Sequence, residues 1–180
     1  GIQDGIENAL YALYDLIYKR GRQDISLVLM GDGDHISALR SLTHEQGLDE
    51  YVNFTGWADR KDIIRYLAVA DVGLVPDPQN GLNEYCTMMK TMEYMAMGKP
   101  VVAFDLPETR FSAQDAALYA TPNLVEDFAN KIETLLDDEE LRSRMGALGR
   151  KRIEEELSWD HSTEHLLQAY ESLFPVLAIS

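Results

Sequence analysis

The stretch of sequence that decides the fold begins with Val72-Gly73-Leu74-Val75-Pro76 and ends with Gly98-Lys99-Pro100-Val101-Val102-Ala103-Phe104. Both ends contain a short apolar run, which is typical of a buried strand. Between them, about Thr87 to Met97, apolar residues recur at helical spacing and stop at the Gly-Lys-Pro turn. A strand, a helix and a strand joined by short turns form a βαβ unit, which predicts a parallel sheet with right-handed crossovers.

The same alternation extends toward the N-terminus. Apolar residues at helical spacing predict a first helix through Ile6, Leu10, Leu13 and Ile17. Further on, Asp59 is a predicted N-cap. The other predicted elements are a buried strand over 25–30 that ends at Gly31-Asp32-Gly33, a helix over 34–46, a strand over 51–54 that ends at Gly56-Trp57, and a helix with Ile63, Ile64, Leu67 and Ala68 facing inward.

Toward the C-terminus the pattern becomes mainly helical. Ala117-Leu118-Tyr119 is a weak candidate strand, and Asn123 with Glu126 forms a capping-box pattern at the start of a helix. A charged helix is predicted over 138–155, followed by one capped by Ser158. The apolar residues on the faces of these helices are Val125, Phe128, Ile132 and Leu135 in the first, and Leu166, Tyr170 and Leu173 in the last.

The length and composition fit one domain over residues 1–180. A chain of 180 residues, 46% of them hydrophobic, can cover one core and is short for two domains. The predicted fold class is therefore α/β, a three-layer αβα Rossmann-like domain with a mainly parallel sheet.

The net charge and the cysteine content limit the expected binding partners and the expected cellular compartment. A formal net charge of -15 repels nucleic acid, although a locally positive pocket can still bind a small anion. Cys86 is the one cysteine, so no intrachain disulfide can form, and a cytoplasmic location is expected. No apolar stretch approaches the roughly 20 residues that a membrane-spanning helix needs.

Candidate binding residues lie in the loops that follow the strands. In open α/β sheets ligands bind outside the carboxyl ends of the strands. Gly31-Asp32-Gly33 could let a phosphate or a sugar approach the backbone, or could simply form a tight turn, because a lone Gly-x-Gly is a weak motif. Trp57 could stack on a nucleobase, but its spacing favours a role in covering the edge of the sheet.

The helix that begins near Thr87 is the more informative feature. Its amino end offers free N–H groups and a partial positive charge to a diphosphate, and Lys90 adds a full charge. Thr87, Lys90 and Tyr94 share a polar line with Thr91 and Glu93 beside it, and Glu93 could bind ribose hydroxyls. Spacing alone also allows a solvated Lys90–Glu93 ion pair. On the opposite side, Met88, Met92 and Met95 form an apolar stripe expected in the core.

A metal site is not expected. His161 and His165 are four residues apart on a predicted helix, but no glutamate follows the first histidine as it does in His-Glu-x-x-His.

Taken together, these motifs resemble the C-terminal domain of family 4 (group 1) glycosyltransferases of the GT-B fold. The resemblance covers nearly the whole chain and keeps the family's order and approximate spacing. The matching segments are Gly31-Asp32-Gly33, 52–57, 70–76, 90–102 and Ser158-Trp159.

The resemblance implies a domain that binds a nucleotide-diphospho-sugar, for a transfer that retains the anomeric configuration without a metal or another cofactor. It implies contacts of the Gly31 turn with sugar and phosphates, of Gly56-Trp57 with the base, of the Thr87–Lys90 turn with the diphosphate, and of Glu93 with the ribose. The implied donor-binding residues are Gly31, Asp32, Gly33, Gly56, Trp57, Glu84, Thr87, Met88, Met89, Lys90, Thr91 and Glu93.

Two departures from the family pattern stand out. The family's first glutamate belongs eight residues before Glu93, where this chain has Tyr85, and Glu84 is one residue away. Thr87 and Met88 stand where a related subgroup has Ser-Pro. In addition, Gln3-Asp4-Gly5 replaces a Lys-Gly, and the strand that precedes it in the family is not in the sequence.

The resemblance implies that the chain is a fragment without its N-terminal acceptor domain, which would be its partner and could bring peripheral membrane contact. Alone, the chain is expected to bind nucleotide weakly and to transfer nothing, and its last helix could drive self-association. Two alternatives remain open. One is half of a GT-B-type nucleotide-sugar epimerase, which the lack of a histidine in the strand-end loops disfavours, and the other is a flavodoxin-like or receiver-like binding module.

Overall fold

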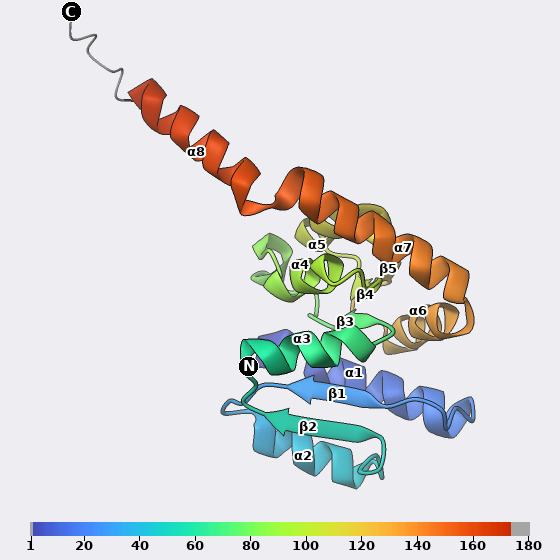
Figure 1. Cartoon of the computed structure of the whole chain (residues 1–180). Helices are drawn as coiled ribbons and strands as arrows, with labels where there is room; N and C mark the ends of the chain where they lie inside the picture. Colours follow the sequence, from blue (N-terminus) through green and yellow to red (C-terminus); the bar gives the residue numbers. More distant parts are fainter. Residues whose placement is uncertain (1, 174–180) are drawn as a thin grey trace, which may run out of the picture.

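The computed structural model describes residues 2–173 and has the alternating order that the sequence predicts (Figure 1). Five strands alternate with helices, and three further helices follow the last strand. The elements are η1 (Ile2–Asp4), α1 (Ile6–Tyr14), η2 (Asp15–Lys19), β1 (Leu27–Met30), α2 (Ile36–Glu45), β2 (Val52–Gly56), α3 (Arg60–Val69), β3 (Gly73–Val75), η3 (Asn83–Tyr85), α4 (Met89–Ala96), β4 (Val101–Phe104), α5 (Pro107–Ala113), η4 (Gln114–Ala116), β5 (Ala117–Ala120), α6 (Val125–Asp137), α7 (Glu139–Arg152), η5 (Ile153–Leu157) and α8 (Trp159–Leu173).

All the strand pairs are parallel, but the strands form two ladders. β1 pairs with β2, and β3, β4 and β5 form a second ladder in that order. The candidate strand at Ala117–Tyr119 is confirmed as β5. Within the described residues, no ladder joins β1 to β3, so the single sheet expected from the sequence is divided between these two strands.

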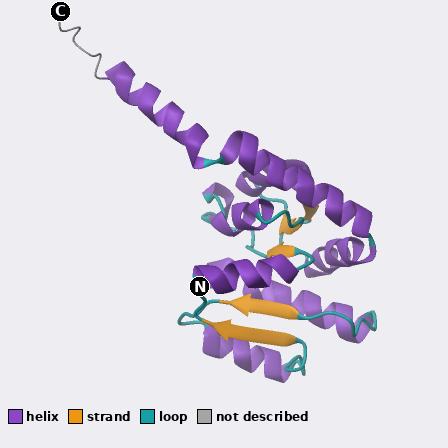
Figure 2. Ribbon diagram, viewed as in Figure 1, coloured by secondary structure: helices purple, strands orange, loops and turns teal. Residues whose placement is uncertain are grey.

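Helices cover both faces of the strands and confirm the three-layer αβα class. Helix α1 contacts both α2 and α6 on one face, whereas α4 packs on β3 and β4 from the other. Figures 1 and 2 show α1 and α2 behind the β1–β2 ladder and α3 above β1, nearer the viewer.

The core is densest around β4. Every residue of this strand is buried, and the rings of Phe104 and Phe128 lie 4.9 Å apart, centroid to centroid. All four residues of β1 are only half-buried, so the prediction of a fully buried strand is wrong there. The reason is that β1 has a strand neighbour on one side alone.

Several local predictions hold and others fail. Asp59 caps α3 by accepting a hydrogen bond from the Asp62 N–H, as predicted. Ile64 is 44% exposed, however, so the predicted inward stripe of α3 is only partly right. Helix α5, which begins at Pro107, was not predicted.

The capping box at Asn123 is also wrong. This residue has a positive φ of 62°, and its side-chain oxygen accepts a hydrogen bond from the Gln79 N–H at 2.8 Å. Leu124 takes the N-cap position of α6 without a side-chain hydrogen bond. Asn123 therefore supports the loop after β3.

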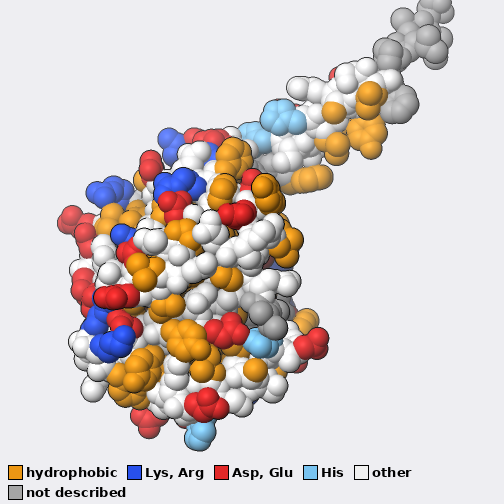
Figure 3. Space-filling model, turned by 180° about the vertical axis from the view of Figure 1, so that it is seen from behind, with side chains coloured by type: hydrophobic (Ala, Val, Ile, Leu, Met, Phe, Trp, Pro, Cys, Tyr) orange, Lys and Arg blue, Asp and Glu red, His pale blue; other side chains and the backbone are white. Residues whose placement is uncertain are grey.

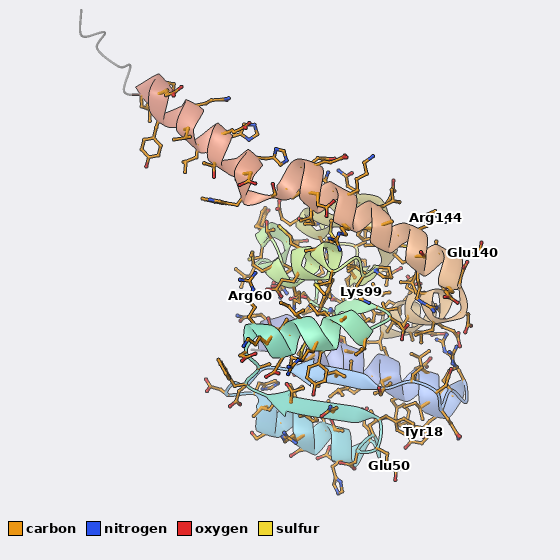
Figure 4. The ribbon with its side chains drawn as sticks, viewed as in Figure 1. Tyr18, Glu50, Arg60, Lys99, Glu140 and Arg144 are labelled. Carbon is orange, nitrogen blue, oxygen red and sulfur yellow. The ribbon has the colours of Figure 1, made fainter. Side chains whose placement is uncertain are left out.

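Two long-range hydrogen bonds connect segments that are distant in the sequence, and Figure 4 labels their donor residues, Lys99 and Tyr18. The Lys99 ammonium donates to the Ala68 carbonyl at 2.9 Å and ties the turn after α4 to α3. The Tyr18 hydroxyl donates to the Gly47 carbonyl at 2.6 Å and ties η2 to the turn before β2.

Helix α8 projects away from the rest of the domain (Figure 1). It has no buried residue, and Figure 3 shows apolar side chains gathered along it. The predicted apolar side of this helix is exposed, with Leu166 at 47%, Tyr170 at 56% and Leu173 at 72%.

Candidate functional site

The carboxyl ends of β1 and β3 open into a cavity of about 630 Å³. Its lining includes five of the predicted donor-binding residues, namely Gly31, Asp32, Gly33, Lys90 and Glu93. Residues from two separate chain segments, the turn after β1 and helix α4, thus meet at one edge, as expected for the ligand site of an open α/β domain. The predicted residues outside this lining are Gly56, Trp57, Glu84, Thr87, Met88, Met89 and Thr91.

The turn after β1 leaves its backbone accessible. Gly31 has φ 127°, which a residue with a side chain rarely adopts, and its N–H donates to the Gly56 carbonyl at 2.9 Å. Gly33 has no such φ, and a Cβ there would meet no atom within 4 Å. Neither backbone strain nor crowding therefore requires a glycine at position 33.

Helix α4 brings Lys90 to the same edge. The helix begins at Met89, and its N-cap residue, Met88, makes no side-chain capping bond. The Lys90 ammonium lies 3.0 Å from Asp77 Oδ1, to which it donates a hydrogen bond, and 2.8 Å from Oδ2, where the geometry is that of an ion pair only. Lys90 therefore pairs with the residue after Pro76 and not with Glu93.

Asp77, the ion-pair partner of Lys90, was not predicted from the sequence. Its side chain is 2% exposed, compared with 25% for Lys90. Burial raises the pKa of the Asp77 carboxyl above its usual value, and the Lys90 charge opposes that effect without cancelling it. The signal for this pair was the Pro-Asp-Pro sequence at the end of β3, since a carboxylate at a strand end faces the ligand edge.

Tyr94 packs beneath this pair and is not part of a polar line. A Cβ on Gly73 would come within 2.3 Å of the Tyr94 ring, so glycine at position 73 permits the ring to lie against β3. Burial raises the pKa of the Tyr94 hydroxyl to about 12. Tyr94 therefore stays neutral and serves packing.

The other predicted residues of this helix have different environments. Thr91 is fully buried, so its hydroxyl cannot reach a ligand in the cavity, and its predicted place on the polar face is wrong. Thr87 donates a hydrogen bond to Glu108 at 3.1 Å. Met95 is fully buried as expected and Met88 packs against the same cluster, whereas Met89 is 68% exposed.

The loop between β3 and α4 is held by a buried amide. Asn83 is 3% exposed, and its Nδ2 donates to the carbonyls of Gln3 and Pro78, both at 2.9 Å. Glu84 follows and accepts a hydrogen bond from the Gln79 side chain at 2.8 Å. Asn83 was not predicted, because nothing in its spacing distinguishes it from other loop asparagines.

Trp57 does not cover the edge of the sheet. Its side chain is 79% exposed, whereas a covering ring would bury one face. Gly56 has φ 68°, a left-handed conformation, at the turn that leads into Trp57. An exposed indole beside the strand ends is free to stack on a flat ligand.

A histidine also lies at the cavity, contrary to the sequence-based expectation. His35, directly before α2, lines it and places Nε2 2.5 Å from Glu7 Oε1 of α1. Both side chains are about 70% buried, with exposures of 29% and 28%. The four strand-end loops themselves contain no histidine, but His35 brings one to the cavity just after the first of them.

Residues 2–173 contain neither a metal-binding cluster nor a membrane-spanning helix. No group of three or more His, Cys, Asp and Glu side chains is arranged to hold a metal ion. In the same residues, no helix combines the length and apolar character needed to cross a membrane.

Curated relatives of the chain transfer sugars, according to their names. A GDP-mannose-dependent monoacylated alpha-(1-6)-phosphatidylinositol monomannoside mannosyltransferase of Corynebacterium glutamicum is 32% identical over 156 residues, which is 84% of this chain and 40% of that protein. An alpha-D-kanosaminyltransferase of Streptomyces kanamyceticus is 29% identical over 79% of this chain and 36% of its own length. The chain thus spans less than half the length of these relatives.

Solved structures with the same fold include sucrose-phosphate synthase from Thermosynechococcus elongatus. It superposes with a TM-score of 0.80 at 25% identity, over 97% of this chain and 43% of the other. Anabaena Alr3699/HepE, solved in complex with UDP and glucose, gives a TM-score of 0.80 at 19% identity over 96% of this chain and 46% of the other.

The family comparison covers most of the chain. Residues 2–138 match the family described as glycosyl transferases group 1, and this range contains all the strands and the whole cavity edge. The resemblance found in the sequence motifs is thereby confirmed, and the chain belongs to the group 1 glycosyltransferases.

Proposed function

We propose that this chain is the donor-binding domain of a retaining glycosyltransferase, which moves a sugar from a nucleotide-diphospho-sugar to an acceptor. The observation that carries the proposal is the position of Lys90 in the first turn of α4, at the mouth of the cavity that Gly31 and Gly33 also line. Membership in the group 1 family supports transfer over the epimerase and the flavodoxin-like alternatives.

The diphosphate would bind at the amino end of α4. Its negative charge faces the N–H groups and the positive end of the helix dipole. An ammonium has three N–H donors, so Lys90 can remain on Asp77 and still offer a hydrogen bond to phosphate. In the transfer step, this arrangement stabilises the charge that develops on the leaving nucleoside diphosphate.

The remaining contacts follow from the accessible groups at the edge. The open backbone at Gly31 and Gly33 suits the sugar and phosphates, and Trp57 suits the base. Glu93, exposed and on the cavity wall, suits the ribose hydroxyls. We propose no metal or other cofactor, because the helix end and Lys90 supply the positive charge.

In the full-length protein, the acceptor half would face this edge, and the enzyme would act in the cytoplasm. The short span relative to the curated relatives supports a second half. Any peripheral membrane contact would come from that half. The described chain alone would bind nucleotide weakly and transfer no sugar.

Titration with UDP, GDP and their sugar conjugates, followed by NMR and calorimetry, tests the proposal. Both nucleotides are needed, because a relative is named for GDP-mannose and a structural neighbour was solved with UDP. Chemical-shift changes at Gly31, Trp57 and Lys90 are expected, and they should persist in EDTA. Absence of nucleotide binding at millimolar ligand would contradict the proposal.

A further inference from the structure

The cavity has few positive groups for a site that would bind a diphosphate. Among the described residues that line it, Lys90 is the only lysine or arginine, and its charge is already shared with Asp77. The carboxylates on the same lining are those of Asp4, Asp24, Asp32, Asp71 and Glu93. A diphosphate therefore enters a field that is largely of its own sign, and a second positive group beside the phosphates would strengthen binding.

His35 is the other side chain on the lining that can carry a positive charge. It follows Gly33 by two residues, on the β1 side of the cavity, whereas Lys90 lies on the β3 side. Its Nε2 lies 2.5 Å from Glu7 Oε1, and Glu7 is not one of the residues that line the cavity. The Glu7 carboxylate therefore lies behind the imidazole, as the Asp77 carboxylate lies behind Lys90.

The Glu7 carboxylate determines which ring nitrogen of His35 carries a proton. An ionised carboxylate can only accept hydrogen bonds, so Nε2 is the donor in this pair. In the neutral ring Nδ1 then has no proton and is an acceptor, whereas in the imidazolium Nδ1 is a second donor. Within residues 2–173 nothing forms a hydrogen bond with Nδ1, so this nitrogen is available to a ligand.

A second histidine–carboxylate pair lies at the other end of α2 and allows a comparison. His44 Nδ1 lies 3.0 Å from Asp49 Oδ2, the two side chains are 83% and 59% exposed, and neither lines the cavity. The His35–Glu7 pair is only 29% and 28% exposed and borders the cavity. Because charges away from bulk water are screened less, a change in the charge of His35 acts strongly on a ligand bound there.

We propose that His35, held by Glu7 and in its imidazolium form, is a second cation for the donor diphosphate, so that donor binding weakens as this ring loses its proton. The inference rests on the proposed function. The imidazolium would donate from Nδ1 to a phosphate oxygen on the β1 side, while Lys90 binds the diphosphate from the β3 side. The neutral ring would direct a lone pair at the same oxygen and repel it. Glu7 is a positioning residue, because it fixes the tautomer and favours the charged ring.

The pH dependence can be assigned because few other groups near the site change charge close to neutral pH. Histidine is the residue type that does so between about pH 5 and 8, whereas carboxylates and ammonium groups usually keep their charge there. Asp77 is the exception to consider, since burial raises the pKa of its carboxyl. The charged groups that share the cavity end with His35 or adjoin it are Asp4 from η1, Glu7 from α1, Asp32 and Asp34 from the turn, Arg40 from α2, and Lys90 and Glu93 from α4.

Calorimetric titration with UDP-glucose and GDP-mannose between about pH 5.5 and 8 tests the inference. Nucleotide-sugars are suitable because they lack the terminal phosphate of UDP or GDP, and the charge of such a group changes near pH 6. For the unaltered chain, we expect affinity to fall about tenfold across this range, which corresponds to one charge-assisted hydrogen bond. His35→Gln should bind weakly at every pH, and Asp77→Asn should keep the pH dependence.

The histidine ring signals in NMR spectra give a second readout, which a purely structural ion pair would not change. A bound nucleotide-sugar that favours the imidazolium must, by linkage, raise the pH at which His35 loses its proton. The His44 ring, paired with Asp49 away from the cavity, is the internal control and should not respond. In Glu7→Gln the His35 transition and the affinity profile should both move to lower pH, because the charge that favours the imidazolium is lost.

Two results would overturn the inference and leave the proposed function intact. One is nucleotide-sugar binding with an affinity that stays constant across the pH range. The other is a pH dependence that persists in His35→Gln or disappears in Asp77→Asn, which would assign it to another group. Failure of both nucleotide-sugars to bind at millimolar concentration would instead contradict the proposed function, and the inference with it.

Discussion

Lys90 and Asp77 form an ion pair in which the lysine is partly accessible from the cavity and the aspartate is buried behind it. The ammonium lies within 3.0 Å of both carboxylate oxygens, and the aspartate is 2% exposed. The lysine is thus fixed at the amino end of α4, while its charge is partly neutralised before any ligand binds.

Replacing Lys90 with alanine should therefore have two effects. Loss of the ammonium removes most of the diphosphate affinity, and it leaves Asp77 buried without a counter-ion, at a cost of about 3 kcal/mol. Denaturant unfolding and nucleotide titration measure the two effects. In Lys90→Ala/Asp77→Asn the stability should largely return while binding stays lost. Binding by either variant as tight as that of the unaltered chain would show that Lys90 does not hold the phosphate.

Asp77 also gives stability a defined pH dependence. Because burial raises its folded pKa above the unfolded value of about 3.9, the folded state holds the proton more tightly. Its contribution to stability therefore falls as pH rises through the window between these two values. Unfolding free energies measured across that window should decline more steeply for the unaltered chain than for Asp77→Asn. Parallel curves would contradict the assignment.

Substitution of Gly33 tests the effect of ligand approach separately from the effect of packing on stability. In Gly33→Ala the new Cβ meets open space, so stability should change by less than about 0.5 kcal/mol, while nucleotide-sugar affinity falls about tenfold. Gly73→Ala is the matched control, since its Cβ would collide with Tyr94 and destabilise the fold. Thermal unfolding and calorimetry distinguish them. Unchanged affinity in Gly33→Ala would leave this glycine without a binding role.

Trp57 offers an optical test of base binding. The chain has two tryptophans, so Trp159→Phe leaves Trp57 as the sole indole reporter. Addition of UDP or GDP should change its fluorescence if the base stacks there. Trp57→Ala should lower affinity by an amount equivalent to about 1–3 kcal/mol of stacking, with little effect on stability because the ring is exposed. A constant signal at saturating nucleotide would place the base elsewhere.

The exposed face of α8 predicts concentration-dependent association. Leu166, Tyr170 and Leu173 are 47%, 56% and 72% exposed, so this helix presents apolar surface to solvent. Light scattering should show a mass that rises with protein concentration, and Leu166→Gln/Tyr170→Gln should keep the chain monomeric. Leu148→Gln, on α7 and 43% exposed, is the control and should have no effect.

Much of this arrangement could be read from the sequence, because strand and helix periodicity is local. β4 lies where its apolar run and the preceding Gly-Lys-Pro turn predict it. The Asp59 cap could be predicted because aspartate is a favoured N-cap residue. The family followed from the order of several motifs. The sequence signal for helix α5 was weaker, because this helix has seven residues and Pro107 is its main signal.

Other failures concern contacts between distant segments. The Lys90–Asp77 pair, the approach of His35 to Glu7, and the hydrogen bond from Gln79 to Asn123 depend on how the loops meet in space. The division between β1 and β3 was equally hidden, since each strand has an ordinary apolar sequence. Periodicity gives an element and its face, but not the identity of its neighbours.

The buried amide of Asn83 links two parts of the chain that have different tasks. It bonds the carbonyl of Gln3, where the chain enters the domain, and that of Pro78, in the segment leading from Asp77 toward α4. One amide thereby joins the segment before α1 to the segment that carries the counter-ion of Lys90. Loss of this single amide would consequently release both segments at once, since each accepts one of its two hydrogen bonds.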